Sequence, residues 1–596
     1  MKKVLLVAYE SRFARCGGIT AVMNYLPGYL RSAAGLATSV ITPFHHRIPE
    51  TSSLPVRPVG TFNVPFFDES VKVNIYRYDD RWHWYFLDAQ DYPLPKVRQI
   101  GEKDERFFGG LKHPYDVGSN AANQWAILRR DSLFFGAAVA RALRELGADI
   151  HWTLVMQDWQ AATAALALAG PDRNHNTRLF LTLHNSYDSG RIEPADLLGV
   201  GIKPEHVPAL EVQSKALNRA IPVSTVLGRA MPLLNKPFFT VSEQFARDFT
   251  EDIFQSGVMA DHLQDILQSP NLVGVNNGPF TSLAVPEKPE LADARRHMYG
   301  PLKEWKSKQK TAAVAALAEF TPDEIHPAWG HIANFVAKAK ASADMPWFVL
   351  AGRDDTRQKG YDVAAEAIRN FLRKPGNDAK AQFLFFPIPG DEGREGLLFL
   401  RRLAEDYKAN VLVLLFIFHE GYMAALQGAA FGVMPSLYEP FGMANEFYLN
   451  GAVGIGRATG GLLQQIVPLR AIPSFTPDVD RRSSRWHPPS VAATGFLYRE
   501  SDNNPEIVGH WKAFNEVKYL SEPGKDRVAE RKKYRLFTDM AGALEQALED
   551  AIEVYSKPPA PDGMQPYYAM LVEGIGHIQR GFSWEWSAAE YNSYLV

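Results

Sequence analysis

A glycine loop near the start of the sequence has the residue types of an anion-binding site. The run Arg15-Cys16-Gly17-Gly18-Ile19 follows an apolar, β-rich stretch at Val4–Tyr9 and opens an amphipathic stretch, Ile19–Ala34. Glycines allow the backbone to approach a phosphate closely, the first N–H groups of a helix attract negative charge, and Arg15 adds a cation. The loop therefore indicates phosphate binding, although many glycine pairs only reverse the chain.

Two cations in the second half of the chain are spaced to bind a diphosphate. Arg353 and Lys359 lie in the segment GRDDTRQKG, between a predicted strand and a predicted helix. Both side chains could converge on one anion and stabilise leaving-group charge; the alternative is a solvated, charged loop. The carboxylates of Asp354 and Asp355 do not predict a metal site, because two adjacent acids without further ligands are more often surface charges.

A third group of polar residues lies within 434–462. Glu439 follows a predicted buried strand and precedes a helix. Thr459-Gly460-Gly461 follows the next predicted strand, where backbone N–H groups could bind an anion or hydroxyls. These glycines are not a dinucleotide fingerprint, because Gly454 and Gly456 are followed by threonine at the third glycine position.

The elements that must position these groups alternate between strand and helix. Apolar, strand-like runs follow the first one at 148–156, 177–185, 346–355, 382–390, 409–418 and 429–436. This alternation predicts parallel sheets with helices on both faces, and such sheets bind ligands at the carboxyl ends of their strands. We expect an α/β protein with two Rossmann-like, doubly wound parallel-sheet domains and a boundary near Pro279–Pro289.

Two segments depart from the alternation of strand and helix. Residues 60–130 are aromatic-rich and irregular, and we interpret them as excursions from the first sheet. The segment 467–493 contains five prolines and four arginines, and it is either a surface loop or a lid over the site.

The composition is that of a globular protein and excludes several classes. A chain of 596 residues is too long for one hydrophobic core, and a net charge of −3 argues against a nucleic-acid partner. Cys16 is the only cysteine, so no internal disulfide can form and a cytoplasmic location is expected. No run of about 20 apolar residues occurs, so we expect no membrane partner.

Eight short motifs, in matching order along the chain, resemble the starch and glycogen synthase family. R-C-G-G-I is similar to the family's K-x-G-G-L, M-P-S-L-Y-E-P-F-G (434–442) to M-P-S-x-x-E-P-C-G, and A-T-G-G-L (458–462) to R-T-G-G-L. The others are Q-D-W-Q (157–160), L-T-L-H-N (181–185), T-V-S (240–242), V-N-N-G-P-F (275–280) and G-F-S-W-E-W-S-A-A-E-Y (581–591). We therefore expect a divergent member of the bacterial and plant-type starch/glycogen synthases.

The resemblance implies a GT-B fold and retaining transfer of glucose. The implied parts are an N-terminal Rossmann-like starch-synthase catalytic domain on the acceptor side, 1–283, and a C-terminal Rossmann-like glycosyltransferase domain on the nucleotide-sugar side, 284–570. The last part, 571–596, is a C-terminal helix that packs back on the first domain, with Trp584 and Trp586 as its docking residues.

The resemblance also implies roles for single residues. Arg353 and Lys359 would bind the diphosphate, Glu439 would bind glucose hydroxyls and His184 would lie beside the anomeric carbon; these four are the expected catalytic residues. The expected substrate-binding residues are Arg15, Gly18, Asp158, Asn277, Thr459, Gly460 and Gly461. The family requires no metal, and its nucleotide-sugar donor is a substrate rather than a cofactor.

Several of these residues also have purely structural interpretations. Asp158 could cap a helix that begins at Trp159, and His184 could be a satisfied core histidine. Glu439 could be a solvated charge in a first helical turn. Tyr438 and Phe441, next to it, are expected to pack.

Departures from the family's pattern concern mainly the acceptor. The family's loop lysine is Arg15 here, its acidic residue after the loop is Ala21, and the aspartate that ends N-G-I-D is Phe280. The 439–459 stretch is one residue shorter, so Glu446 has no secure counterpart.

The expected activity is transfer of glucose from ADP-glucose or UDP-glucose to the non-reducing end of an α-1,4-glucan. The expected partners are accordingly one of these nucleotide sugars and an α-glucan or oligosaccharide acceptor. Ala21 and Phe280 motivate a first alternative, a GT-B glucosyltransferase with a small-sugar or metabolite acceptor. The second alternative is a non-catalytic glucan-binding homologue.

Overall fold

The chain folds into two compact units in a computed structural model: Met1–Gly278 with Ser583–Val596, and Pro279–Phe582. The residues that the structure describes are 3–89, 107–108, 110, 113–116, 121–147, 150–168, 177–202, 207, 212–214, 221–223, 225–268, 270–280, 285, 287–388, 393–516, 527–561 and 563–595. Among these residues no helix is both long enough and apolar enough to cross a bilayer.

A nine-stranded sheet forms the core of the first unit, in the order β11-β10-β7-β6-β1-β2-β5-β4-β3. The seven strands from β11 to β5 are parallel, and β4 and β3 continue the sheet antiparallel. The bounds are β1 Lys3–Val7, β2 Ala37–Pro43, β3 Arg57–Phe66, β4 Glu69–Asp79, β5 His83–Asp88, β6 Trp152–Gln157, β7 Arg178–Leu183, β10 Phe238–Thr240 and β11 Leu272–Gly274. A separate short hairpin pairs β8 Val212–Ser214 with β9 Ile221–Val223.

Helices connect most of the parallel strands of the first unit, as the alternating pattern predicts, and the C-terminal helix adds to them. They are α1 Gly18–Ser32, α2 Pro49–Ser52, α3 Ala121–Glu145, α4 Asp158–Leu168, α5 Pro194–Gly199, α6 Val226–Ala230, α7 Glu243–Glu251, α8 Gln264–Leu267 and α24 Trp584–Leu595. The central strand β6 is buried at every position, as a strand covered on both faces must be.

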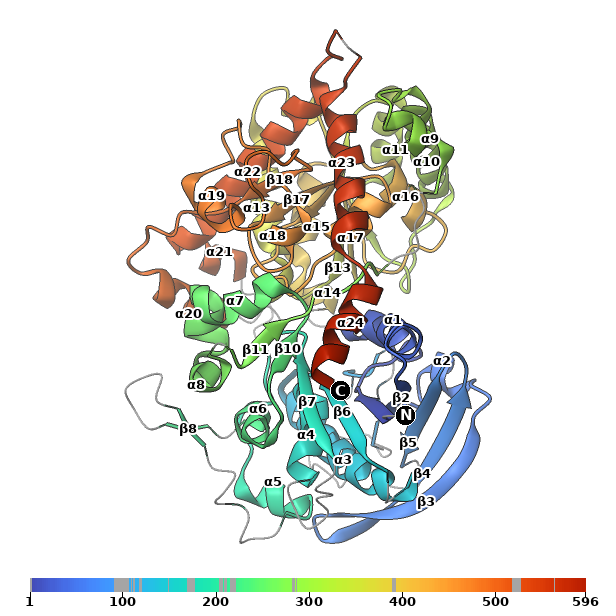
Figure 1. The fold of residues 1–596 in the computed structure, drawn as a ribbon. Helices are drawn as coiled ribbons and strands as arrows, with labels where there is room; N and C mark the ends of the chain where they lie inside the picture. The colour runs from blue at the N-terminus through green and yellow to red at the C-terminus, as the bar shows by residue number, and fades with distance from the viewer. Residues whose placement is uncertain are drawn as a thin grey trace. The chain divides into compact units, whose positions relative to one another are not determined.

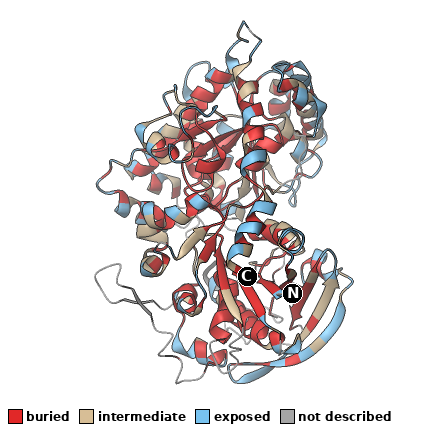
Figure 2. Ribbon diagram, viewed as in Figure 1, coloured by how far each residue is buried: buried red, intermediate tan, exposed pale blue. Residues whose placement is uncertain are grey.

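The three strands at the β3 edge of this sheet differ from the structure predicted for their residues. Residues 57–88, expected largely as irregular excursions, form the regular strands β3, β4 and β5. Exposed and buried positions alternate over much of β3 and β4, so these strands cover the core with one face only (Figure 2). Of the remaining expected excursion, 90–106 lies outside the described residues, and 121–130 is regular structure as well, the start of the helix α3.

The C-terminal helix α24 returns to the first unit and lies against α1, which confirms the predicted return (Figure 1). Trp584 is buried and stacks on Tyr25, with ring centroids 5.5 Å apart. Arg178 donates to the carbonyl oxygens of the last turn, at 3.0 Å for Leu595. Trp586, however, is 57% exposed, so its expected docking role was wrong.

The second unit contains a seven-stranded sheet in the order β12-β15-β14-β13-β16-β17-β18. All neighbours are parallel except β12 and β15. The bounds are β12 Ala328–Trp329, β13 Trp347–Arg353, β14 Gln382–Ile388, β15 Val411–Leu414, β16 Phe431–Met434, β17 Val453–Arg457 and β18 Phe496–Tyr498. Two mostly parallel, helix-covered sheets confirm the predicted α/β class.

The helices of the second unit precede, connect and follow its strands. They are α9 Pro289–Ala294, α10 Gly300–Glu319, α11 Ile332–Ala341, α12 Thr356–Lys359, α13 Tyr361–Arg373, α14 Gly393–Gly396, α15 Leu398–Asp406, α16 Tyr422–Gly428, α17 Ala444–Leu449, α18 Leu462–Gln465, α19 Pro477–Ser483, α20 Ile507–Glu516, α21 Arg527–Arg531, α22 Arg535–Ser556 and α23 Pro566–Gly581. The Pro- and Arg-rich segment 467–493 contains α19, whose first turn the Thr476 hydroxyl caps.

Candidate functional site

The candidate residues of the second unit lie at the carboxyl ends of three neighbouring strands. Arg353 ends β13, Glu439 follows β16, and Thr459-Gly460-Gly461 follows β17. These strands are adjacent and parallel in the sheet, so their following loops meet at one edge. This is the edge at which parallel α/β sheets bind ligands.

Glu439 is held by two hydrogen bonds to one of its carboxylate oxygens. Lys359 donates to Oε2 at 2.7 Å, and the Ser436 hydroxyl donates to the same atom at 2.7 Å. The residue is only 6% exposed, so the interpretation of Glu439 as a solvated charge was wrong. The expected sugar-binding carboxylate and one expected phosphate-binding cation are therefore in direct contact.

The backbone fixes Lys359 beside this carboxylate. Gly360, which follows it, has φ +63°, and a Cβ there would lie 2.2 Å from the carbonyl oxygen of Pro435. The backbone N–H of Leu437 donates to the carbonyl of Gln358 at 2.7 Å. The segment GRDDTRQKG thus packs directly on the loop M-P-S-L-Y-E-P.

Arg353 and its acidic neighbours have separate structural partners. Arg353 donates to the side-chain oxygen of Gln358 at 3.0 Å. Asp354 accepts the backbone N–H of Gly393 at 2.7 Å, and Asp355 caps α12 through the N–H of Arg357 at 3.0 Å. Both carboxylates are at most 1% exposed, so their interpretation as surface charges was wrong. Within the described ranges, no group of three or more His, Cys, Asp or Glu could hold a metal ion.

The two glycines of Thr459-Gly460-Gly461 are required by the packing of two loops. Gly460 has φ +47°, and a Cβ there would lie 1.8 Å from the carbonyl oxygen of Glu439. Gly461 donates its N–H to that oxygen at 3.0 Å, and its own Cβ would lie 2.1 Å from the carbonyl oxygen of Phe441. Contact between the loops, as well as any contact with a ligand, therefore demands these glycines.

Glu446 is a further acidic group, whose carboxyl interacts with the charges of Lys359 and Glu439, and no role was predicted for it from the sequence. It lies in α17 and is half-buried. Burial raises the pKa of Glu446 to about 7, although the charge of Lys359 lowers it, and the charge of Glu439 raises it further. Its carboxyl group therefore titrates near neutral pH.

In the first unit, Asp158 joins the ends of β6 and β7. It begins α4 with φ +61° and is buried. Its carboxylate accepts the backbone N–H of His184 at 2.6 Å and the side-chain amide of Asn185 at 2.9 Å. Helix capping alone does not account for these contacts, because both donors belong to the neighbouring strand end.

The His184 ring is buried and has a defined hydrogen-bond partner. Its Nε2 lies 2.7 Å from Oε1 of Gln157, whose amide group donates to the carbonyl of Val155 at 3.1 Å. Because this amide contact points Oε1 toward the ring, Nε2 carries the proton. Burial lowers the pKa of His184 to about 3, so the imidazole is neutral at neutral pH. The satisfied-histidine interpretation fits this geometry.

Glu10, for which no role was predicted from the sequence, accepts hydrogen bonds from the glycine loop. Glu10 Oε2 accepts the N–H of Gly17 at 2.7 Å and the hydroxyl of Thr20 at 2.9 Å, and its Oε1 accepts the Tyr115 hydroxyl at 2.8 Å. The N–H of Gly17 is therefore engaged within the protein. A Cβ added at Gly18 would meet nothing within 4 Å, so this glycine is open to approach.

The two remaining substrate-binding candidates of the first unit lie beside other strand ends. The Nε of Arg15 donates to the carbonyl of Arg12 at 2.7 Å, within the loop that follows β1. Asn277 follows β11 and is buried, and its backbone N–H donates to the carbonyl of Val241 at 3.2 Å. The structure thus brings Asp158 and His184 into contact and places the other candidates on the loops after β1 and β11.

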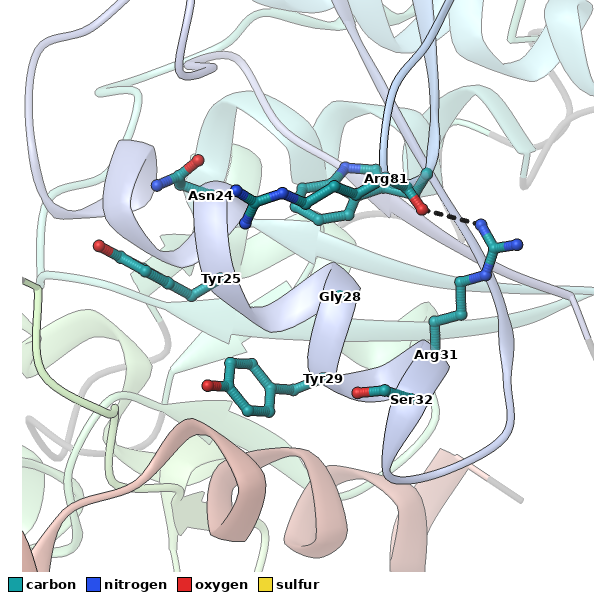
Figure 3. Close-up of a pocket in the computed structure, with 8 residues that line it drawn as sticks. Asn24, Tyr25, Gly28, Tyr29, Arg31, Ser32 and Arg81 are labelled. Atoms are coloured by element: carbon teal, nitrogen blue, oxygen red, sulfur yellow. Dashed lines mark hydrogen bonds between the residues drawn. The ribbon is translucent and has the colours of Figure 1, made fainter. Parts of the chain in front are cut away.

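A cavity of about 640 Å³ in the first unit is separate from these strand ends (Figure 3). It lies along the second half of α1 and the turn between β4 and β5, where Arg31 donates to the carbonyl of Arg81 at 2.8 Å. Its lining residues are Asn24, Tyr25, Gly28, Tyr29, Arg31, Ser32, Arg81 and Trp82. No candidate site residue belongs to this lining.

Comparison with known proteins agrees with the arrangement of these motifs. Residues 3–265 match the family described as starch synthase catalytic domain, and residues 285–446 match family 4 glycosyltransferases in conflict systems. The glycogen synthase of Thermosipho africanus is 23% identical over 483 residues, which cover 78% of this chain and 85% of the relative. The chain is a distant relative of the starch and glycogen synthases. The glycogen synthase of Alkaliphilus metalliredigens is 24% identical over 479 residues, which again cover 78% of this chain and 85% of the relative.

A solved starch synthase shares the fold. The catalytic domain of starch synthase IV from Arabidopsis thaliana, bound to ADP and acarbose, aligns with a TM-score of 0.65 and 16% identity. The alignment covers 100% of this chain and 98% of that one. The chain therefore has the GT-B fold of that starch synthase, and its sequence is similar to those of the glycogen synthases.

Proposed function

We propose that the protein transfers glucose from ADP-glucose or UDP-glucose to the non-reducing end of an α-1,4-glucan, with retention of configuration. The observation that carries the proposal is the contact of Lys359 and Ser436 with Glu439, beside the loop Thr459-Gly460-Gly461. Relatives named glycogen synthase, and a starch synthase whose structure contains ADP and acarbose, support the same donor and acceptor classes.

In this proposal the second unit binds the donor. Arg353 and Lys359 bind the diphosphate and stabilise the charge that develops as the nucleotide leaves, a role that preorganised cations perform well in a site that excludes water. Glu439 accepts hydrogen bonds from glucose hydroxyls, and the Thr459-Gly460-Gly461 loop provides backbone N–H groups. The leaving-group charge is met by side chains, so the proposal needs no metal.

The remaining residues to which the proposal assigns a role belong to the first unit. Asp158 fixes the end of β7, which places His184 for contact with the reacting sugar. Gly18 leaves its backbone open to the donor, and Arg15 supplies charge on the same loop. Asn277 contributes from the loop after β11.

A direct assay tests the proposal. The purified protein is incubated with ADP-glucose or UDP-glucose, with and without glycogen or malto-oligosaccharides, and both nucleotide release and the chain length of the products are measured. We expect nucleotide release that depends on the glucan and chains that grow by single glucose units. The absence of acceptor-dependent turnover with either donor would overturn the proposal.

One observation favours a second candidate with the same donor chemistry. Phe280, at the position of the family's aspartate, packs against Phe441, with ring centroids 5.3 Å apart. An apolar pair at this position suits a different acceptor, such as a small sugar or another metabolite. Nucleotide release with such an acceptor, without elongation of a glucan, would select this candidate.

A further inference from the structure

Three charged side chains are buried behind the proposed donor loops of the second unit. Arg457 ends β17, and Arg499 and Glu500 follow the adjacent strand β18. The exposed fractions of these side chains are 1%, 2% and 0%. Charges buried this deeply are costly unless each one is paired and hydrogen-bonded, so the partners of the group indicate its purpose.

The guanidinium of Arg457 holds an anion on one side and a loop on the other. Its Nε donates to Oε2 of Glu500 at 2.8 Å, and its Nη2 donates to Oε1 of the same carboxylate. The remaining nitrogen, Nη1, donates to the carbonyl oxygen of Leu437 at 2.6 Å. Leu437 lies two residues before Glu439, in the loop that carries the proposed sugar-binding carboxylate.

Arg499 makes the matching contact with the second loop. Its Nε lies 3.2 Å from Oε1 of Glu500, and its Nη1 donates to the carbonyl oxygen of Ala458 at 3.0 Å. Ala458 directly precedes Thr459-Gly460-Gly461. Burial alone would raise the pKa of Glu500, but the two arginines outweigh it and hold that pKa at about 2. The shared carboxylate of Glu500 is therefore charged at neutral pH.

We propose that Arg457, oriented by Glu500, is a positioning residue that sets Glu439 and the Thr459-Gly460-Gly461 loop in register for glucosyl transfer. The proposal rests on the proposed function of the site. A planar guanidinium can make the bidentate contact with Glu500 and the contact with the Leu437 carbonyl at the same time. A lysine at the same position keeps the charge but lacks this fork, so it cannot hold both partners in the same geometry.

Lys306 provides a matched control at the opposite ends of the same strands. It is also buried, and its Nζ donates to the carbonyl oxygen of Ala429 at 2.6 Å and to that of Gly451. These residues precede β16 and β17, whereas the contacts of Arg457 lie at or beyond their carboxyl ends. Loss of Lys306 therefore damages the packing of the same strands without touching the loops of the site.

The test compares Arg457→Lys, Glu500→Gln and Lys306→Met in the full-length protein, at a temperature where circular dichroism shows each variant folded. We expect Arg457→Lys and Glu500→Gln to lower kcat for glucosyl transfer at least tenfold, with the KM for the glucan acceptor unchanged. Lys306→Met should lower the melting temperature but keep kcat within about twofold of the wild type. Wild-type kcat in both folded site variants, or an equal loss in Lys306→Met, overturns the positioning role.

Binding of ADP separates this proposal from the function on which it rests. Calorimetry with ADP on the same variants should show an affinity at least tenfold weaker in Arg457→Lys and Glu500→Gln, and wild-type affinity in Lys306→Met. If the wild type binds ADP but transfers no glucose, the proposed function fails and the positioning role is judged by these affinities. A wild type that neither transfers glucose nor binds ADP overturns both.

Discussion

Lys359 Nζ lies 2.7 Å from Oε2 of Glu439, so the proposed phosphate cation and the proposed sugar carboxylate neutralise each other before a donor arrives. In the proposed function, a diphosphate competes with Glu439 for Lys359, and its binding frees the carboxylate to accept hydrogen bonds from sugar hydroxyls. Lys359 thus exchanges one anionic partner for another when the donor binds. Neither charge has to remain unpaired in the partly desolvated site before binding.

Removal of the lysine charge should abolish most of the activity. We expect Lys359→Gln to lower kcat/KM for the nucleotide sugar on the order of 10²-fold or more, because one preorganised contact with leaving-group charge typically contributes this much. Arg353→Ala should show a loss of the same order. Initial-rate assays measure the effect, with Lys374→Gln as control, because Lys374 pairs with Glu545 and Glu549 on the surface. Wild-type rates in Lys359→Gln would contradict the phosphate assignment.

Two glycines of the site should differ sharply in their tolerance of a methyl group. Gly460→Ala places its Cβ against the Glu439 carbonyl, and we expect a loss of about 2–4 kcal/mol in unfolding free energy from strain and displaced backbone. Gly18→Ala meets open space in the first turn of α1 and should stabilise by up to about 1 kcal/mol. Chemical denaturation measures both. If Gly18→Ala is stable but inactive, the donor contact proposed for Gly18 gains support; equal stability of the two variants would contradict the packing argument.

The contact between Asp158 and the end of β7 should be measurable as a coupling energy. Asp158→Asn keeps the shape and tolerates the positive φ, but it weakens a charge-assisted pair of hydrogen bonds, and we expect a loss of about 1.5–3 kcal/mol. A double-mutant cycle with Asn185→Ala isolates the side-chain contact. Strict additivity of the two substitutions would show that this contact contributes nothing to stability.

His184 should make the first unit more sensitive to acid. Its pKa is about 3 in the folded protein and about 6.5 in an unfolded chain, so above pH 6.5 both states are neutral and the group has no effect on the pH dependence. Between pH 6.5 and 3 only the unfolded state takes up the proton, and stability falls by up to about 1.4 kcal/mol per pH unit. Denaturation at pH 7, 5.5 and 4 should show a smaller decline in His184→Gln than in the wild type. Identical declines would contradict the neutral, buried ring.

Glu446 should affect stability in the opposite pH range. Its pKa is about 7 when folded, against the ordinary 4.5, so the folded state holds a proton that the unfolded state has lost. The resulting destabilisation grows as pH rises from 4.5 to 7 and is constant above pH 7. Glu446→Gln should therefore raise the melting temperature more at pH 8 than at pH 4.5. Glu573→Gln, an exposed position on α23, should show no such difference; a pH-independent gain in Glu446→Gln would contradict the raised pKa.

The sequence predicts the fold best where one buried strand ends in a polar loop. The burial of β1 and β6 follows from their continuous apolar runs, and it places the glycine loop and Asp158 correctly at strand ends. The pattern was harder to recognise in β3, where Pro58 and Pro65 interrupt the alternation and the strand buries only one face. Propensity alone therefore suggested irregular structure where antiparallel pairing made a strand.

The contacts within the site could be predicted only in part. Glu10 was within reach of sequence reasoning, because it follows a buried strand and lies seven residues before Gly17, whose N–H it accepts. The contact between Arg457 and Glu500 could not be predicted from the sequence. The two residues are 43 positions apart, and only the adjacency of β17 and β18 brings them together. From a single sequence, it cannot be predicted which charged residues, far apart in the chain, pair with the same buried partner.

The return of α24 to the first unit has a consequence for the order in which the protein can be made. Residues 3–278 are synthesised long before Trp584 and Tyr591. Yet Trp584 and Tyr591 cover Tyr25 and Thr182 of the same unit. The first half of the chain must therefore leave the ribosome with part of its apolar surface bare while about 300 residues of the second unit are synthesised. Translation speed and chaperone binding during this interval, rather than final stability alone, should govern how much of the protein reaches its native state.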